Sequence, residues 1–233
     1  MDEAQSKRPR SVFFRVVVAF LLCGLALVLL GLPLFLSAGS LRFTEAWLFL
    51  GAIDIPWFLI LTYLAVKDPA LFENRTTARE EERSQMLLKL LLTGLLLIAL
   101  VICGLDFRYH WSNVPRMVVF VSTVVLILGN IMLFVVVKQN RYGSRAIAIQ
   151  EDQQVVDAGL YSVVRHPMYL AFAIIFCPSP LVLGSFYALL LTLFMPILIA
   201  LRISSEEQLL QKRLEGYSSY MRKVRFRLIP HIW

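Results

Sequence analysis

Long apolar stretches alternate with short polar segments along most of the chain. Four of them, at 13–36, 45–66, 87–105 and 115–137, each approach the roughly 20 residues that cross the hydrocarbon core of a bilayer. We therefore expect four membrane-spanning helices in this part of the chain. A fifth apolar block, at 168–201, is too long for a single upright crossing.

The segment CPSPLVLG, residues 177–184, interrupts this fifth block near its middle. Its two prolines and its glycine break helices, because proline lacks the N–H donor and glycine costs backbone entropy. We expect a hairpin of two spans here, with the sixth span ending near Leu201. The predicted fold class is all-α, a polytopic transmembrane helical bundle of about six crossings whose last two form a helical hairpin.

After the last span, apolar side chains recur every three or four residues. The stripe comprises Leu210, Leu214, Tyr217, Met221 and Val224. Such a period predicts one amphipathic C-terminal helix, which lies on the membrane surface or covers a site at its edge. Most of the distinctive polar chemistry also falls in this half of the chain, so we divide the chain into regions 1–137 and 138–233.

Composition and charge both fit a membrane protein. The chain is 58% hydrophobic and has a net charge of +7. With the N-terminus in the cytoplasm, 20 of the 23 Lys and Arg residues lie inside, and only Arg42, Arg108 and Arg116 lie outside. This is the positive-inside bias, so the charge reflects topology and does not indicate nucleic acid. We expect both termini in the cytoplasm and the first apolar stretch to be a retained anchor.

Other residues inside the spans suggest no obvious chemistry. Cys23, Cys103 and Cys177 lie in apolar stretches, where a thiol acts as a small hydrophobe, so we expect no disulfide, no metal and no thiol chemistry. The dinucleotide, P-loop, zinc-protease and C-x-x-C motifs are missing from the sequence. Asp54 is an acidic residue deep in a span, and both a functional role and packing beside the Pro56 kink remain open.

The segment GLYSVVRHPMYLAF stands at the start of the fifth span. Pro167 suits the first turn of a helix, and it pushes His166 toward an extended, cap-like conformation. Two interpretations are open. In one, Arg165 snorkels to lipid headgroups while Tyr161 and Tyr169 belong to an interfacial belt. In the other, the N–H groups at the helix start bind an anion together with Arg165 and His166.

A second polar segment, RISSEEQLL, follows the sixth span. Arg202 and Glu206 are four residues apart, so they share a helix face if that span continues into the tail. They are either an ordinary surface pair, with Ser204 and Glu207 forming a capping box, or functional charges at the end of a span. Arginine before glutamate is the weaker orientation for such a pair, which favours function.

In this order and spacing, GLYSVVRHPMY, RISSEEQLL and the later GYSSYMRKVRFRLIP resemble the isoprenylcysteine carboxyl methyltransferase family. This family belongs to a wider group of membrane methyltransferases that includes the phospholipid N-methyltransferases. The resemblance covers roughly residues 140–230. It implies S-adenosylmethionine as the cofactor and makes 138–233 a methyltransferase core, preceded by the four N-terminal transmembrane helices of 1–137.

The resemblance also implies roles for individual residues. The implied cofactor contacts are Val155, Val156, Tyr161, Arg165, His166, Pro167, Met168, Tyr169 and Glu206. Arg202 corresponds to an arginine that meets the substrate, and we assign catalytic roles to Arg202, Glu206 and Glu207. The chain departs from the family pattern at Ala171, where glycine is usual, and at Glu215-Gly216, where Phe-Gly is usual. Neither departure removes a polar group.

The chemistry of these residues agrees with that cofactor. A helix start beside Arg165 and His166 suits the cofactor's carboxylate, Glu206 suits its ammonium, and the tyrosine faces suit its adenine. Methyl transfer from a sulfonium is an in-line displacement, so catalysis depends mainly on positioning. A carboxylate acceptor needs no base, whereas an amine must first lose a proton. We expect methylation of the carboxylate of a lipid-like or prenylated acceptor at the cytoplasmic face.

Three other functions were weighed. One is a phospholipid or small-amine N-methyltransferase. Another is a non-enzymatic membrane protein, for which Asp54 and the prolines of the spans would be suitable. The third is an NADPH-dependent membrane reductase with a similar helical pocket. The membrane is expected to be a bacterial inner membrane or the endoplasmic reticulum, and membrane lipids are the other expected partners.

Overall fold

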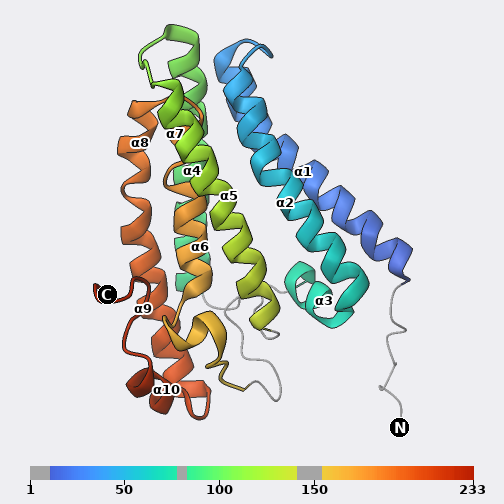
Figure 1. The fold of residues 1–233 in the computed structure, drawn as a ribbon, viewed down its shortest axis with the longest axis vertical. Helices are drawn as coiled ribbons and strands as arrows, with labels where there is room; N and C mark the ends of the chain where they lie inside the picture. Colours follow the sequence, from blue (N-terminus) through green and yellow to red (C-terminus); the bar gives the residue numbers. More distant parts are fainter. Residues whose placement is uncertain (1–10, 78–82, 141–153) are drawn as a thin grey trace.

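A computed structural model describes residues 11–77, 83–140 and 154–233, which form a helical bundle (Figure 1). The helices are α1 (Val12–Ala38), α2 (Thr44–Lys67), α3 (Pro69–Thr77), α4 (Arg83–Tyr109), α5 (Arg116–Gln139), α6 (Pro167–Phe176), α7 (Ser179–Val182), α8 (Phe186–Thr192), α9 (Met195–Arg213) and α10 (Tyr217–Lys223). A 3-10 turn, Gly159–Ser162, precedes α6. These described residues contain no strand, so the predicted all-α class is confirmed.

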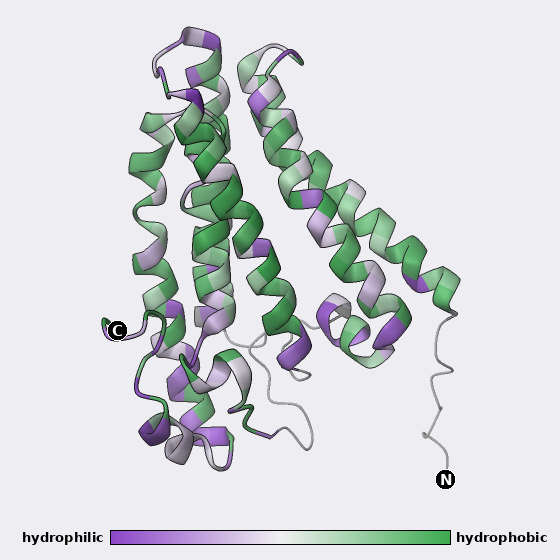
Figure 2. Cartoon of the chain, in the orientation of Figure 1, coloured by the Kyte–Doolittle hydropathy of each residue, from purple (hydrophilic) through white to green (hydrophobic). Residues whose placement is uncertain are grey.

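Among the described residues, five helical segments are long and apolar enough to cross a membrane. They are Val12–Ala38, Thr44–Lys67, Gln85–Tyr109, Arg116–Gln139 and Phe186–Arg213, the last of which combines α8 and α9. The shorter apolar segment Pro167–Val182, made of α6 and α7, is the remaining predicted crossing. Hydrophobic residues cover the lengths of these helices, and hydrophilic ones gather near α3 and α10 (Figure 2). The chain is an integral membrane protein with several spans.

The helical hairpin has its break where the sequence predicted it. α7 ends at Val182, and Gly184 adopts the left-handed region, with φ of 75°, before α8 begins. The helix itself does not end near Leu201, where the last span was predicted to end, because α9 continues to Arg213. No proline or glycine lies between these two positions, so the helix passes without interruption from the membrane into the tail. A capping box at Ser204 is therefore wrong.

The apolar stripe of the tail does not form one helix. α9 ends at Arg213, Gly216 has a left-handed φ of 80°, and α10 begins at Tyr217. The left-handed residue turns the chain, because glycine adopts this conformation without a steric penalty. The stripe still gathers into one buried cluster, in which Leu214 and Tyr217 pack with Val155 from the segment before α6. It therefore covers an internal site at the bundle edge.

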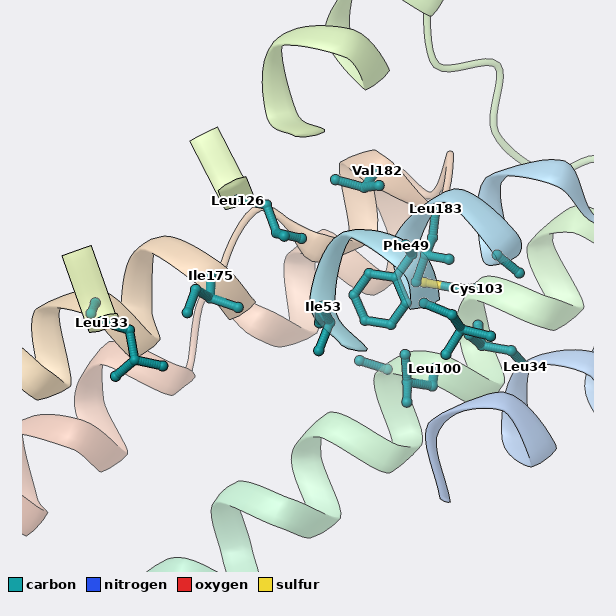
Figure 3. Close-up of a cluster of buried hydrophobic side chains, with 14 of the residues drawn as sticks. Leu34, Phe49, Ile53, Leu100, Cys103, Leu126, Leu133, Ile175, Val182 and Leu183 are labelled. Atoms are coloured by element: carbon teal, nitrogen blue, oxygen red, sulfur yellow. The ribbon is translucent and has the colours of Figure 1, made fainter. Parts of the chain in front are cut away.

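The buried core joins the first four spans to the hairpin. Phe49 and Ile53 of α2 lie in one cluster with Leu100 of α4 and Val182 of α7 (Figure 3). α5 approaches α6 closely at Gly129, where a Cβ would lie 2.8 Å from Cγ1 of Ile175. A larger residue there would require the Ile175 side chain or the helices themselves to shift.

Polar residues inside the spans mostly serve packing. The Trp57 indole N–H of α2 donates to Asn130 Oδ1 of α5 over 2.9 Å. Cys23 and Cys103 are buried and Cys177 is half-buried, and all three thiols are free. Asp54 is half-buried on α2.

A carboxylate ties the turn of the hairpin, between α7 and α8, to α4. Asp106 is 2% exposed. It accepts hydrogen bonds from the backbone N–H and the hydroxyl of Ser112, each over 2.7 Å, and from the hydroxyl of Ser185. The Ser112 hydroxyl in turn accepts from the N–H of Phe186. These bonds hold the beginning of α8 against the end of α4, far from α10 (Figure 1).

Candidate active site

A cavity of about 510 Å³ opens at the α3 and α10 end of the bundle, where α2, α3, α4, α6, α9 and α10 meet the segment before α6. This volume lies within the range of ordinary ligand pockets. The predicted site residues that line it are Val155, Val156, Tyr161, Arg165, His166, Met168, Tyr169, Arg202 and Glu206. Pro167 and Glu207 are not among the lining residues. The structure thus gathers most of the predicted site into one place.

The segment before α6 is held at the cavity by side chains of neighbouring elements. The Gln139 side-chain oxygen accepts from the N–H of Leu160 over 2.9 Å, and Asn140 donates to the Tyr161 hydroxyl over 3.0 Å. Gly159 has a φ of 62°, and a Cβ there would collide with Gln139. Burial raises the pKa of Tyr161 to about 12, so its phenol is neutral at neutral pH.

Glu207 lies beneath the cavity and organises the Arg-His-Pro motif. Pro167 opens α6 and His166 is its N-cap residue, as the sequence predicted. Arg165 Nε donates to Glu207 Oε1 over 2.6 Å, and His166 Nε2 lies 3.2 Å from the same oxygen. Arg227 Nε donates to Glu207 Oε2 over 2.9 Å. Glu207 is only 2% exposed, so the anion that this motif holds is the chain's own carboxylate.

The tail residues complete this cluster through their backbone. Arg165 Nη1 donates to the carbonyls of Val224 and Arg225, each over 2.8 Å. The N–H groups of Arg165 and His166 donate to the carbonyls of Phe226 and Arg227, each over 2.9 Å. The interpretation in which Arg165 snorkels to lipid is therefore wrong, because the guanidinium is buried among protein acceptors. Its contacts fix its orientation at the cavity wall.

Arg202 and Glu206 meet through a tyrosine. Arg202 Nε donates to the Tyr169 hydroxyl over 2.9 Å, and that hydroxyl donates to Glu206 Oε2 over 2.7 Å. Arg202 Nη1 also donates to the Gln85 carbonyl of α4 over 3.0 Å. Arg202 is 6% exposed. This chain of hydrogen bonds joins α4, α6 and α9 and replaces the simple surface pair that the sequence left open.

The cavity continues from these polar residues into an apolar limb between the spans. The side chains of this limb include Trp57, Leu92, Leu96, Phe172, Phe176, Met195 and Ile199. Trp57 is ten residues from the end of α2 at Lys67, a rise of about 15 Å along the helix axis. The limb therefore reaches roughly half the thickness of a bilayer core. One end of the cavity suits a charged group and the other suits a hydrocarbon chain.

Comparison with known proteins connects this geometry with a family. The family model for isoprenylcysteine carboxyl methyltransferase matches residues 117–212. These residues make up about two fifths of the chain. The match supports a membrane methyltransferase of the isoprenylcysteine carboxyl methyltransferase kind. The comparison with curated proteins gave no match.

The family match covers part of the residues that line the cavity. It extends from α5 to α9 and includes both polar motifs. Trp57, Arg75 and Lys89 line the cavity from α2, α3 and α4, and Tyr217 and Tyr220 line it from α10. All five lie outside the matched residues.

Sequence reasoning missed several of these lining residues. Arg75 and Lys89 had been interpreted only as cytoplasmic charges, and no helix was expected between the second and third spans. Tyr217 had been placed in the apolar stripe without regard to its hydroxyl, although a polar tip in a buried stripe was a usable signal. Asn140 has no distinguishing sequence pattern.

Proposed function

We propose that the protein transfers a methyl group from S-adenosylmethionine to the carboxylate of a lipid-like acceptor at the cytoplasmic end of the bundle. One observation carries the proposal: Arg202 and Glu206 line the same cavity as the apolar limb that ends near Trp57. A charged cofactor and an acceptor with a hydrocarbon chain can therefore meet at one point. A prenylated acceptor, which the family name suggests, has this chemistry.

The residues present fit S-adenosylmethionine. Glu206 is the carboxylate available for its ammonium, and the cavity faces of Arg165 and His166 are cationic or polar partners for its carboxylate. Tyr161, Tyr169, Met168, Val155 and Val156 offer flat or apolar surfaces for its adenine. When bound, this cofactor supplies a methyl group carried on a sulfonium. The sulfur is left as a neutral thioether once the methyl group has been transferred. The chain's own work is to bind, to orient and to exclude water.

Arg202 has the chemistry to orient the acceptor. A guanidinium forms fork-like hydrogen bonds with both oxygens of a carboxylate. One of these oxygens forms the new bond to the methyl carbon as the carbon–sulfur bond breaks, and no proton moves. Because Tyr169 and the Gln85 carbonyl hold Arg202 in place, its position is set before the acceptor arrives.

The charge of the cavity favours a carboxylate over an amine acceptor. Arg75, Lys89 and Arg202 line it, and Glu206 is its one acidic lining residue in the described part of the chain. An amine that must lose a proton has no carboxylate here other than the one assigned to the cofactor. The division at residue 137 is part of the same proposal, with cofactor contacts from 138–233 and an acceptor limb to which both parts contribute.

S-adenosylhomocysteine should raise the thermal midpoint of the purified protein in detergent. A ligand that binds only the folded state stabilises it by about 2.7 kcal/mol at a hundredfold excess over its dissociation constant. Glu206→Ala and His166→Ala should each reduce this shift, because both residues line the cavity. NADPH is the control ligand and should give no shift. A full shift in both variants would contradict the site assignment.

Cysteine labelling in intact cells should place the cavity in the cytoplasm. A membrane-impermeant thiol reagent should label Asn113→Cys, in the connection between α4 and α5, but should label Ser218→Cys on α10 only after permeabilisation. Both positions are exposed. The unsubstituted protein is the control, since its three cysteines lie within the spans. Labelling in the opposite order would reverse the proposed topology.

A further inference from the structure

Tyr217 has a buried hydroxyl that forms no hydrogen bond to any residue in the described part of the chain. The residue is 4% exposed, and it lines the cavity. Buried hydroxyls almost always have partners, because losing water without a replacement bond is unfavourable. An unpaired hydroxyl in the wall of a ligand cavity therefore points to a hydrogen bond that a ligand completes.

The other tyrosine of α10, Tyr220, shows that the fold can provide a partner for a buried tyrosine hydroxyl. Tyr220 is also buried, and its hydroxyl donates to the Tyr161 carbonyl over 2.7 Å. The two rings lie 5.7 Å apart between centroids. The Tyr220 hydroxyl is thus bonded to the segment before α6. The Tyr217 hydroxyl is equally buried but has no such bond. The pair provides a natural comparison.

The charges around Tyr217 indicate which part of a ligand it meets. Burial raises the pKa of its phenol, and the nearby carboxylates of Glu207 and Glu206 raise it further. The group therefore keeps its proton and can donate. The Arg165 guanidinium also acts on Tyr217, but its Nε and Nη1 already donate to Glu207 and to carbonyls of the tail. A ligand carboxylate beside Arg165 has two oxygens and can accept from a second donor as well.

We propose that the Tyr217 hydroxyl donates a hydrogen bond to the carboxylate at the amino-acid end of S-adenosylmethionine. This inference rests on the proposed function and adds a binding residue from α10, outside the family-matched segment. Glu206, Arg165 and Tyr217 then surround the amino-acid end, and the nucleoside lies toward the segment before α6. Tyr217 binds the cofactor through this hydrogen bond and takes no part in proton transfer.

Calorimetric titration of Tyr217→Phe with two ligands tests this role. S-adenosylhomocysteine has the amino-acid end, and 5′-methylthioadenosine has the same nucleoside without it. We expect Tyr217→Phe to weaken S-adenosylhomocysteine about tenfold, a change of about 1.4 kcal/mol, and to leave 5′-methylthioadenosine unchanged. Without ligand, its thermal midpoint should be equal to or above that of the wild type, because an unpaired hydroxyl is removed.

Tyr220→Phe is the matched control, and it should lower the thermal midpoint because it removes a formed hydrogen bond. Unchanged affinity of Tyr217→Phe for S-adenosylhomocysteine would overturn the inference. Equal weakening of both ligands would do the same, since it would place the hydroxyl at the nucleoside. A lowered midpoint for Tyr217→Phe would show that the hydroxyl has a protein partner. If the wild type binds neither ligand, the proposed cofactor itself is wrong.

Discussion

Arg202→Lys should reduce the rate of methyl transfer on the order of 10²-fold, the scale expected when a reacting atom is misplaced by about 1 Å. Arg202 donates to the Tyr169 hydroxyl and to the Gln85 carbonyl at the same time. A lysine ammonium is a point charge on a flexible stem and cannot keep both bonds while gripping a carboxylate with a planar fork. The rate is measured at saturating cofactor with a lipid carboxylate acceptor, as base-labile methyl ester formed.

The control for this variant is Arg222→Lys, which makes the same exchange at an exposed position of α10. It should keep the wild-type rate. Affinity of Arg202→Lys for S-adenosylhomocysteine should change much less than its rate, because the proposed role of Arg202 is to hold the acceptor and not the cofactor. A rate near that of the wild type would remove Arg202 from the acceptor site. A product stable to base, a methylamine, would instead support an amine acceptor.

Glu207→Ala should destabilise the folded protein by about 3–5 kcal/mol, the usual cost of leaving a buried charge without its partner. Glu207 is 2% exposed and accepts from Arg165, His166 and Arg227. Its removal leaves Arg165 buried without a carboxylate and frees Arg227 from α9. The free energy of unfolding is measured by denaturant titration of the protein in detergent micelles.

Asp157→Asn is the matched control, because it breaks the Lys223–Asp157 pair of 2.7 Å, whose side chains are 65% and 50% exposed. Exposed pairs contribute little to stability, so this variant should unfold nearly as the wild type does. Equal behaviour of the two variants would show that the Glu207 cluster is not structural. We assigned Glu207 a catalytic role from the sequence, whereas its position below the cavity supports an indirect role through Arg165 and His166.

The parts of the fold that follow from periodicity and helix breakers were predictable. The spans and the hairpin at CPSPLVLG appear where the sequence placed them. Pro167 starts α6 because its missing N–H costs nothing there. The two polar motifs converge because one stands directly before the first helix of the hairpin and the other follows its second helix. This convergence needs only the hairpin.

The direction in which individual side chains point could not be predicted. Glu206 and Glu207 are neighbours, yet successive helical residues point about 100° apart, so one lines the cavity and the other enters the buried cluster. Only the position of α9 against the tail decides between them. The turn at Gly216 could have been inferred from the glycine, but the stripe around it favoured a continuous helix.

The unequal lengths of the spans also set a condition on the surrounding bilayer. α1 has 27 residues and is about 40 Å long, whereas the crossing from Pro167 to Val182 rises only about 24 Å, against a hydrocarbon core of about 30 Å. α1 leans relative to the other spans (Figure 1), which shortens its reach across the membrane. A crossing this short would be matched by thinning of the bilayer beside it, at a modest cost per ångström of mismatch. The bonds from Ser112 and Ser185 would then keep the buried Asp106 carboxylate inside the protein and away from lipid tails.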